Sequence, residues 1–241
     1  NNLMSEAWAS DLMRLNKSFI IDRTGKSKRE IYQGLNLASE YIEDSILDKN
    51  EPIWIAQKQG RAKDGIDETD PALLKMIHLI KRKSIRINDY FNSLCFIPVA
   101  VSYEFDPNDL FKANELYALK KNQEYIKSDR EDLNSIANGI SGQKGLVNLN
   151  IGPPIIFKED DYETCARLIS QSILKLYKLQ PSNFAACDIQ NINYTLDCNF
   201  SNNQIQLAKD YLEERTKTLK PGIKALLLQQ YSNPVLQKEK L

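Results

Sequence analysis

A short basic loop contains the residue types that most directly suggest chemistry. It runs from Gln57 to Gly65, and Lys58, Arg61 and Lys63 follow one another closely within it. The apolar residues before it are expected to form a strand, and α/β folds bind ligands in the loops that follow their strands. Ammonium and guanidinium groups suit a phosphate or a carboxylate. The loop is therefore a candidate anion site, and a solvated basic turn is the alternative.

Arg23 stands in the same relation to an earlier apolar run, just after Phe19–Asp22. If the two runs are neighbouring strands, Arg23 and Arg61 could converge on one anion. The alternative for Arg23 is a salt bridge to Asp22 or to another nearby acid.

Histidine chemistry in this chain depends on one residue, because His78 is the only histidine. His78 lies among apolar residues of an expected helix, where a packed side chain is more common than a catalytic base. The acidic stretch 64–70 does not match the EF-hand pattern, and no metal site is expected there.

Composition excludes several classes of protein. The 241 residues carry 32 basic and 32 acidic side chains, so a nucleic-acid binder, which usually has a basic excess, is not expected. The four cysteines form no C-x-x-C pair and fit a reducing, cytoplasmic protein. No signal peptide is visible, and the longest apolar run is too short to span a bilayer.

Hydrophobic periodicity predicts alternating helices and strands over the first part of the chain. The expected strands are Phe19–Ile21, Ile53–Ala56, Cys95–Tyr103 and Leu146–Ile151, and the third reads as buried on both faces. Expected helices cover Leu3–Leu15, Ile31–Ile46, a segment opened by Asp70–Pro71, Leu110–Lys121, Glu124–Ile140, Tyr162–Leu176, Ile205–Leu219 and Gly222–Tyr231. The predicted fold is α/β, with a mixed, largely buried β-sheet flanked by helices.

Domain organisation follows from where the strands end. Residues 1–158 are expected to form the α/β domain, and residues 159–241 a helical C-terminal region packed on it.

Three ordered segments resemble the glycerolipid acyltransferases, the superfamily of glycerol-3-phosphate and 1-acylglycerol-3-phosphate acyltransferases, in a divergent bacterial branch. The segments are Phe19–Arg23, Ile55–Gly65 and Phe96–Glu104. The resemblance covers roughly the first 105 residues, and it rests on the order and spacing of the segments together.

The resemblance implies transfer of a fatty acyl group from acyl-CoA or acyl-carrier protein to a hydroxyl of a phosphorylated glycerol acceptor, without a cofactor. Arg23 would bind the acceptor phosphate. The acceptor block matches Gln59, Gly60 and Arg61, with Lys58 and Lys63 beside them, and Pro98 matches a proline near the acyl site. It also implies a cytoplasmic enzyme, peripheral to the inner membrane.

The sequence departs from the family in two respects. Gln59 stands where the family has an acid, so a charge is lost from the acceptor block. The family's His-x-x-x-x-Asp block, which supplies the general base, is not present: the residue five beyond His78 is Lys83. The chain is therefore expected to be inactive alone, with the His–Asp pair upstream of Asn1. A non-catalytic lipid-phosphate-binding or scaffold module is the alternative.

Overall fold

A computed structural model describes residues 7–15, 18–19, 27–58, 60, 62–121, 125 and 130–241. The chain divides into two compact units, each built from separated stretches of sequence. The first unit contains residues 1–60, 68–98 and 152–172, and the second contains residues 61–67, 99–151 and 173–241. The expected boundary near residue 158 does not coincide with this division. The assignment of 1–158 as an acyltransferase domain stays a prediction.

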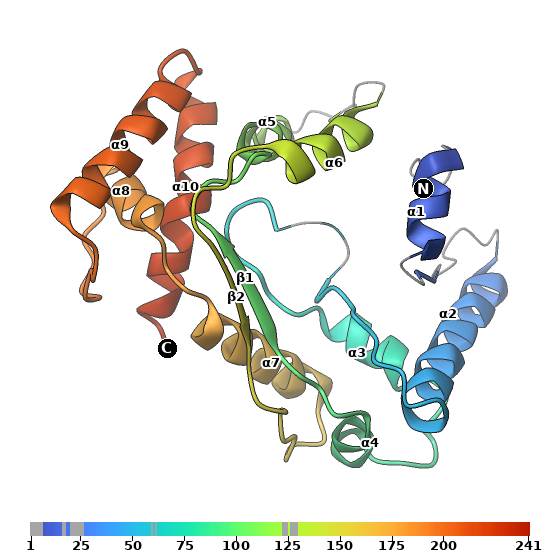
Figure 1. The fold of residues 1–241 in the computed structure, drawn as a ribbon. Helices are drawn as coiled ribbons and strands as arrows, with labels where there is room; N and C mark the ends of the chain where they lie inside the picture. Colours follow the sequence, from blue (N-terminus) through green and yellow to red (C-terminus); the bar gives the residue numbers. More distant parts are fainter. Residues whose placement is uncertain are drawn as a thin grey trace. The chain divides into compact units, whose positions relative to one another are not determined.

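The described part of the first unit is helical (Figure 1). Its elements are α1 (Ala7–Leu15), α2 (Lys28–Glu43), a π-helical turn η2 (Asp44–Asp48), α3 (Pro71–Ile77), α4 (Ile87–Leu94) and the start of α7 (Tyr162–Leu176). Local signals explain where two of these helices begin. Ser27 accepts a hydrogen bond from the Glu30 N–H at α2, and Asp70 accepts one from the Ala72 N–H at α3.

An aromatic cluster forms part of the core of the first unit. The Phe91 ring lies 5.4 Å from the Phe157 ring and 5.2 Å from the Phe96 ring, and Phe91 is fully buried. The Ser39 hydroxyl donates to the Ile77 carbonyl (2.8 Å), which fastens α2 to the end of α3. Because α3 is held in this way, the position of the next residue, His78, is also fixed.

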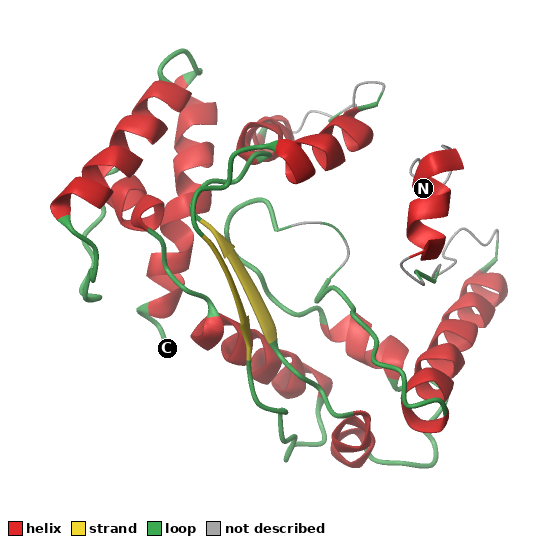
Figure 2. Cartoon of the chain, in the orientation of Figure 1, coloured by secondary structure: helices red, strands yellow, loops and turns green. Residues whose placement is uncertain are grey.

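The second unit consists of a two-stranded sheet and a group of packed helices (Figure 2). Strands β1 (Val99–Tyr103) and β2 (Val147–Ile151) pair antiparallel, with Val101 opposite Leu149. The helices are α5 (Asp109–Lys120), α6 (Glu131–Ser141), the end of α7, α8 (Pro181–Ile189), α9 (Asn202–Thr216) and α10 (Pro221–Lys238).

The core of the second unit lies between α5, α8, α9 and α10. Its buried apolar side chains include Ala113, Ala185, Leu212 and Leu227, each at 0% exposure. The small alanines allow the helices to approach closely, while the leucines fill the space between them. Figure 1 shows α8, α9 and α10 side by side, in agreement with the contacts between them.

The prediction of a mixed, largely buried β-sheet is wrong. The described residues are mostly helical, and their only sheet is the β1–β2 pair, so the largely buried sheet is replaced by a small one exposed on one face. Residues 53–56 form no strand, and Trp54 is 74% exposed. The expected strand Phe19–Ile21 lies mostly outside the described residues, so the structure does not test it.

Several boundaries also differ. The run Cys95–Tyr103 is paired only from Val99, because Cys95 ends α4 in a left-handed conformation (φ 55°). The helix expected over Glu124–Ile140 is described only as α6, which begins at Glu131. Helices α4 and α8 were not expected at all, whereas α2, α3, α5, α7 and α9 confirm the predicted positions within a few residues. Helix α10 begins where it was expected but continues to Lys238, beyond the predicted end at Tyr231.

Candidate functional site

The predicted anion site is described only in part. Arg23, Gln59 and Arg61 lie outside the residues that the structure describes. Lys58 and Gly60 belong to the first unit, and Lys63 belongs to the second. The described residues are therefore considered within their own units.

The first residues of the loop are anchored to the start of α3. The Gln57 carbonyl accepts a hydrogen bond from the Asp70 N–H (2.9 Å), and its side-chain oxygen accepts one from the Thr69 hydroxyl (2.8 Å). The Thr69 N–H in turn donates to the Ser170 hydroxyl on α7 (2.9 Å). These bonds hold the chain just before Lys58, so the loop leaves from a fixed point.

Two glycines in the loop have positive φ angles, in line with the tight backbone expected there, but they serve different purposes. Gly60 has φ +82°, and no described atom lies within 4 Å of where its Cβ would be. Gly65 has φ +77°, and a Cβ there would lie 2.1 Å from the Gln230 carbonyl oxygen on α10. Gly60 thus leaves its backbone open to approach, whereas Gly65 packs tightly against a helix.

The second half of the loop is docked on the helices of the second unit. The Asn233 side chain donates to the Asp64 carbonyl (2.6 Å), and Lys63 forms an ion pair with Glu115 of α5. The Lys63 and Glu115 side chains are 25% and 15% exposed. The charge of Lys63 is thus already matched by a carboxylate, and an anionic ligand would compete with Glu115 for it.

Pro98 is buried and directly precedes β1. Its carbonyl accepts a hydrogen bond from the Gly152 N–H (2.9 Å), next to the ladder between β1 and β2. Proline has no N–H to donate, and this first position before a strand suits it. A backbone hydrogen bond therefore holds Pro98, and its predicted position near an acyl site stays a prediction.

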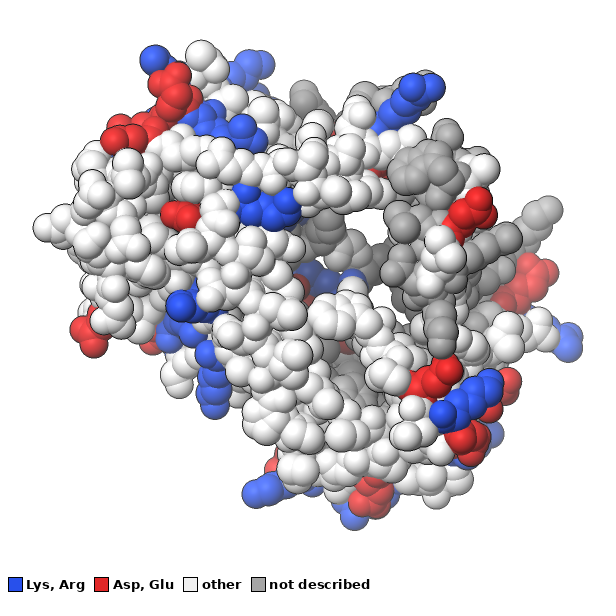
Figure 3. Space-filling model, viewed as in Figure 1, with Lys and Arg blue, Asp and Glu red and all other residues white. Residues whose placement is uncertain are grey.

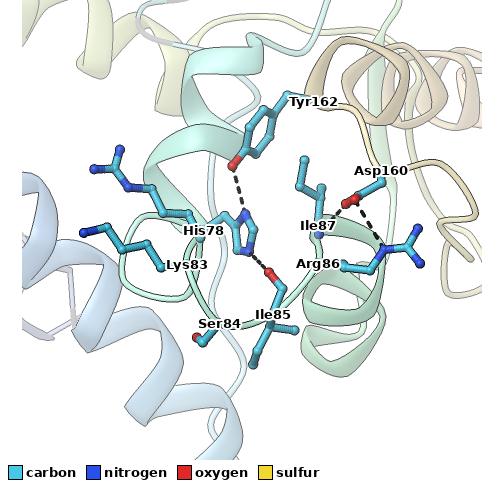
Figure 4. Close-up of a pocket in the computed structure, with 9 residues that line it drawn as sticks. His78, Lys83, Ser84, Ile85, Arg86, Ile87, Asp160 and Tyr162 are labelled. Carbon is cyan, nitrogen blue, oxygen red and sulfur yellow. Dashed lines mark hydrogen bonds and ion pairs between the residues drawn. The ribbon is translucent and has the colours of Figure 1, made fainter.

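A pocket of about 380 Å³ lies in the first unit, between the end of α3, the turn that follows it, the start of α4 and the start of α7 (Figure 4). Its polar walls come from His78, Arg86, Asp160 and Tyr162, with Arg82, Lys83 and Ser84 in the turn. No sequence signal pointed to this pocket, because Asp160 and Tyr162 are more than 70 residues from the turn that they face.

His78 is bound at both ring nitrogens. Nε2 lies 3.0 Å from the Ile85 carbonyl oxygen, and Nδ1 lies 2.8 Å from the Tyr162 hydroxyl (Figure 4). A carbonyl only accepts, so Nε2 carries the proton and Nδ1 accepts from Tyr162. Burial lowers the pKa of His78, although its contact with Ile85 opposes this change. The 2% exposed His78 is therefore a neutral, packed side chain, as the sequence indicated.

Most charged groups of the pocket also interact with other groups of the protein. Asp160 accepts a hydrogen bond from the Ile87 N–H (2.7 Å) at the start of α4 and forms an ion pair with Arg86 (3.3 Å). Arg82 lies over the Tyr32 ring of α2 at 5.9 Å. Lys83 and Arg86 extend to opposite sides of His78 in Figure 4. Arginine and lysine side chains bring positive charge to the wall of the pocket. Its histidine and its carboxylate, His78 and Asp160, are bonded to other groups of the protein.

The described residues contain no group of three or more histidine, cysteine or acidic side chains placed to hold a metal ion. Among the described helices, none is long and apolar enough to cross a membrane.

Comparisons of the chain with protein-family models, with curated proteins and with solved structures found no match.

Proposed function

We propose that this chain is part of a glycerolipid acyltransferase that acylates a hydroxyl of a glycerophosphate or lysophospholipid, with acyl-CoA or acyl-carrier protein as donor. The observation that carries the proposal is the ordered set of three sequence segments around Arg23, the loop 57–65 and Pro98. Each segment alone is modest, and the resemblance to this superfamily rests on their order and spacing together.

The described loop supports this proposal through its backbone. Gly60 has a left-handed conformation, and no described atom lies within 4 Å of where its Cβ would stand. Gln57 accepts hydrogen bonds from Thr69 and Asp70, the two residues just before α3, so the chain leading to Lys58 is held in place. In the proposal, Arg23 and Arg61 neutralise the acceptor phosphate, while Lys58 and Gln59 line the same loop.

The proposal assigns no catalytic residue within the described part of the chain. His78 is the only histidine, and both of its nitrogens are hydrogen-bonded inside the protein. A general base on the acceptor hydroxyl must have a free nitrogen or oxygen within hydrogen-bonding reach. The base would therefore come from a His-x-x-x-x-Asp block outside these residues. As the resemblance implies, the proposed enzyme is cytoplasmic and peripheral to the membrane.

The alternative is a lipid-phosphate-binding or scaffold module without catalysis. The observation that favours it is the engagement of His78, which leaves the described part of the chain without an available imidazole.

One experiment separates these two functions. Acyl transfer from a long-chain acyl-CoA and from acyl-carrier protein to glycerol 3-phosphate and to lysophosphatidate is measured for the 241-residue chain and for the full gene product. We expect acyl transfer by the full gene product. Its Arg23→Ala and Arg61→Ala variants should lose this activity or show a raised KM for the acceptor. Lys75→Ala is the matched control, because Lys75 forms an exposed pair with Glu163. Absence of transfer in both proteins, with phospholipid binding retained, would favour the scaffold.

A further inference from the structure

The pocket around His78 carries a local excess of positive charge. Its nine lining residues all belong to the first unit, and Asp160 is the single carboxylate among them. Three of the others are cations: Arg82, Lys83 and Arg86. His78 adds no charge, because burial lowers its pKa and its Nδ1 accepts a hydrogen bond. The whole chain is neutral, and basic and acidic side chains are interspersed on the face shown in Figure 3. The excess is therefore a property of the pocket and does not reflect the composition of the chain.

Asp160 neutralises only part of this charge. Its Oδ1 accepts a hydrogen bond from the Ile87 N–H (2.7 Å), and its Oδ2 accepts one from Nε of Arg86 (3.3 Å). Nε is the inner nitrogen of the guanidinium group, and the two terminal nitrogens of Arg86 have no hydrogen-bond acceptor among the described residues. The Arg86 side chain is 65% exposed, so these nitrogens can reach a ligand. An anion would meet donors there that the described part of the protein leaves unused.

The other two cations of the pocket are not paired with an acid. Lys83 forms no hydrogen bond or ion pair with a described residue. Arg82 lies over the Tyr32 ring at 5.9 Å, and a neutral ring does not cancel the charge of the guanidinium group. Lys81, in the same turn, pairs with Glu43 (2.9 Å) and does not line the pocket. The cation of the turn that an acid neutralises is thus the one that lies outside the pocket.

The turn that carries these cations has a fixed backbone. The N–H groups of Ser84 and Ile85 donate to the Lys81 carbonyl (2.8 and 3.0 Å), and His78 Nε2 donates to the Ile85 carbonyl (3.0 Å). Because the backbone is held before a ligand arrives, binding needs to order only the side chains. The entropic cost of binding is therefore smaller than it would be for a mobile basic segment.

We propose that this pocket binds a phosphate monoester, held by Lys83 on one side of His78 and by Arg86 on the other, with Arg82 adding positive charge. Figure 4 shows Lys83 and Arg86 on opposite sides of His78. Three cations against one carboxylate leave a charge that a phosphate dianion matches and a single carboxylate does not. The volume of about 380 Å³ lies within the range of roughly 300–1,000 Å³ that is typical of small-molecule pockets, so an organic group fits beside the phosphate. This site lies beyond the proposed acyltransferase function and uses none of its residues.

Isothermal titration calorimetry with phenyl phosphate, near neutral pH and at low salt, tests this proposal. We expect the unmodified chain to bind phenyl phosphate. Lys83→Gln and Arg86→Gln should each bind it roughly tenfold more weakly, because each removes one charge-assisted contact. Lys49→Gln is the matched control and should bind as the unmodified chain does. Lys49 also belongs to the first unit, but its exposed side chain pairs with Asp44 and does not line the pocket.

A second variant separates this pocket from the proposed acceptor site. Binding that depends on Lys83 and Arg86 should persist in Arg23→Gln, Arg61→Gln, so failure of the acceptor site and failure of this pocket are distinguishable. Lys83 and Arg86 are both exposed, so their variants should keep the circular dichroism of the unmodified chain.

A vesicle assay distinguishes a lipid headgroup from a soluble phosphate. The chain is sedimented with phosphatidylcholine vesicles that contain or lack phosphatidate. Cosedimentation that requires phosphatidate, Lys83 and Arg86 would identify a lipid headgroup as the source of the phosphate. Binding of phenyl phosphate without cosedimentation would identify a soluble phosphate monoester. Absence of binding to both probes, or equal binding by the unmodified chain and the Lys83→Gln, Arg86→Gln double variant, would overturn the proposal.

Discussion

Arg215 holds a buried carboxylate, and replacing it with methionine should destabilise the second unit strongly. Arg215 on α9 donates from Nε and Nη2 to Asp109 of α5, at 3.0, 2.9 and 2.6 Å. Asp109 is completely buried, and the Arg215 side chain is 31% exposed. Hydrogen bonds to Asp109 raise the pKa of Arg215, so the guanidinium stays charged at any pH of interest.

The expected loss in the free energy of unfolding depends on the hydrogen bonds that Asp109 keeps after the substitution. Breaking a buried ion pair by removing one partner costs about 3–5 kcal/mol. Asp109 would keep two donors, the Tyr231 hydroxyl (3.0 Å) and the Leu110 N–H (2.6 Å). Because these donors and the partial exposure of Arg215 reduce the loss, we expect a cost near the lower end, about 3 kcal/mol.

Urea unfolding followed by circular dichroism measures this cost, with Lys217→Met as the matched control. Lys217 follows α9 directly and pairs with Glu214 at 3.3 Å, but both side chains are more than two thirds exposed. Removal of such a surface pair should cost about 0–1 kcal/mol. The double variant Asp109→Asn, Arg215→Met should be more stable than Arg215→Met alone, because the unpaired charge is gone. Equal costs for Arg215→Met and Lys217→Met would refute the reasoning.

Two further predictions concern the first unit and the basic loop. Burial lowers the pKa of His78 below its ordinary value of 6.5, so the unfolded chain takes up the proton first and the stability of the folded chain should fall as the pH drops below about 6.5. His78→Gln should flatten this dependence in urea unfolding between pH 7.5 and pH 5.5, where no second histidine titrates; an unchanged slope would contradict the assignment. Gly65→Ala should destabilise the chain far more than Gly60→Ala, because only at Gly65 would the Cβ meet backbone, at 2.1 Å from an oxygen of Gln230. A cost at Gly60 above the roughly 1–2 kcal/mol of a left-handed alanine would mean that its surroundings are occupied.

Helices were predicted well where the sequence carries local signals. The Asp70–Pro71 pair marks the start of α3, and both residues act within the first turn, so no distant contact is needed to place it. Helix α8 was missed for the opposite reason. Its residues from Pro181 to Cys187 are all buried, so it has no polar face and no apolar stripe for periodicity to detect.

The strands were predicted less well, because a strand depends on a partner that is often far away in sequence. Ile53–Ala56 is apolar and β-branched in part, but it forms no ladder with the described residues. Val99–Tyr103 pairs with a segment almost 50 residues later, which its own composition does not reveal. The pocket around His78 is similar, since Tyr162 reaches it from 84 residues away.

Two observations bear on the function together: His78 is hydrogen-bonded at both ring nitrogens, and no described atom lies near the Cβ position of Gly60. A buried, neutral imidazole with both nitrogens bonded stabilises its surroundings, and it cannot take a proton from a substrate without breaking the contact to Tyr162 or Ile85. Gly60, in contrast, has a backbone that nothing in the described part of the chain covers. The described part of the chain thus has a place near Gly60 where a ligand could approach the backbone, and its imidazole is engaged within the protein. Under either proposed function, a variant of Gly60 should alter ligand binding, whereas a variant of His78 should alter stability.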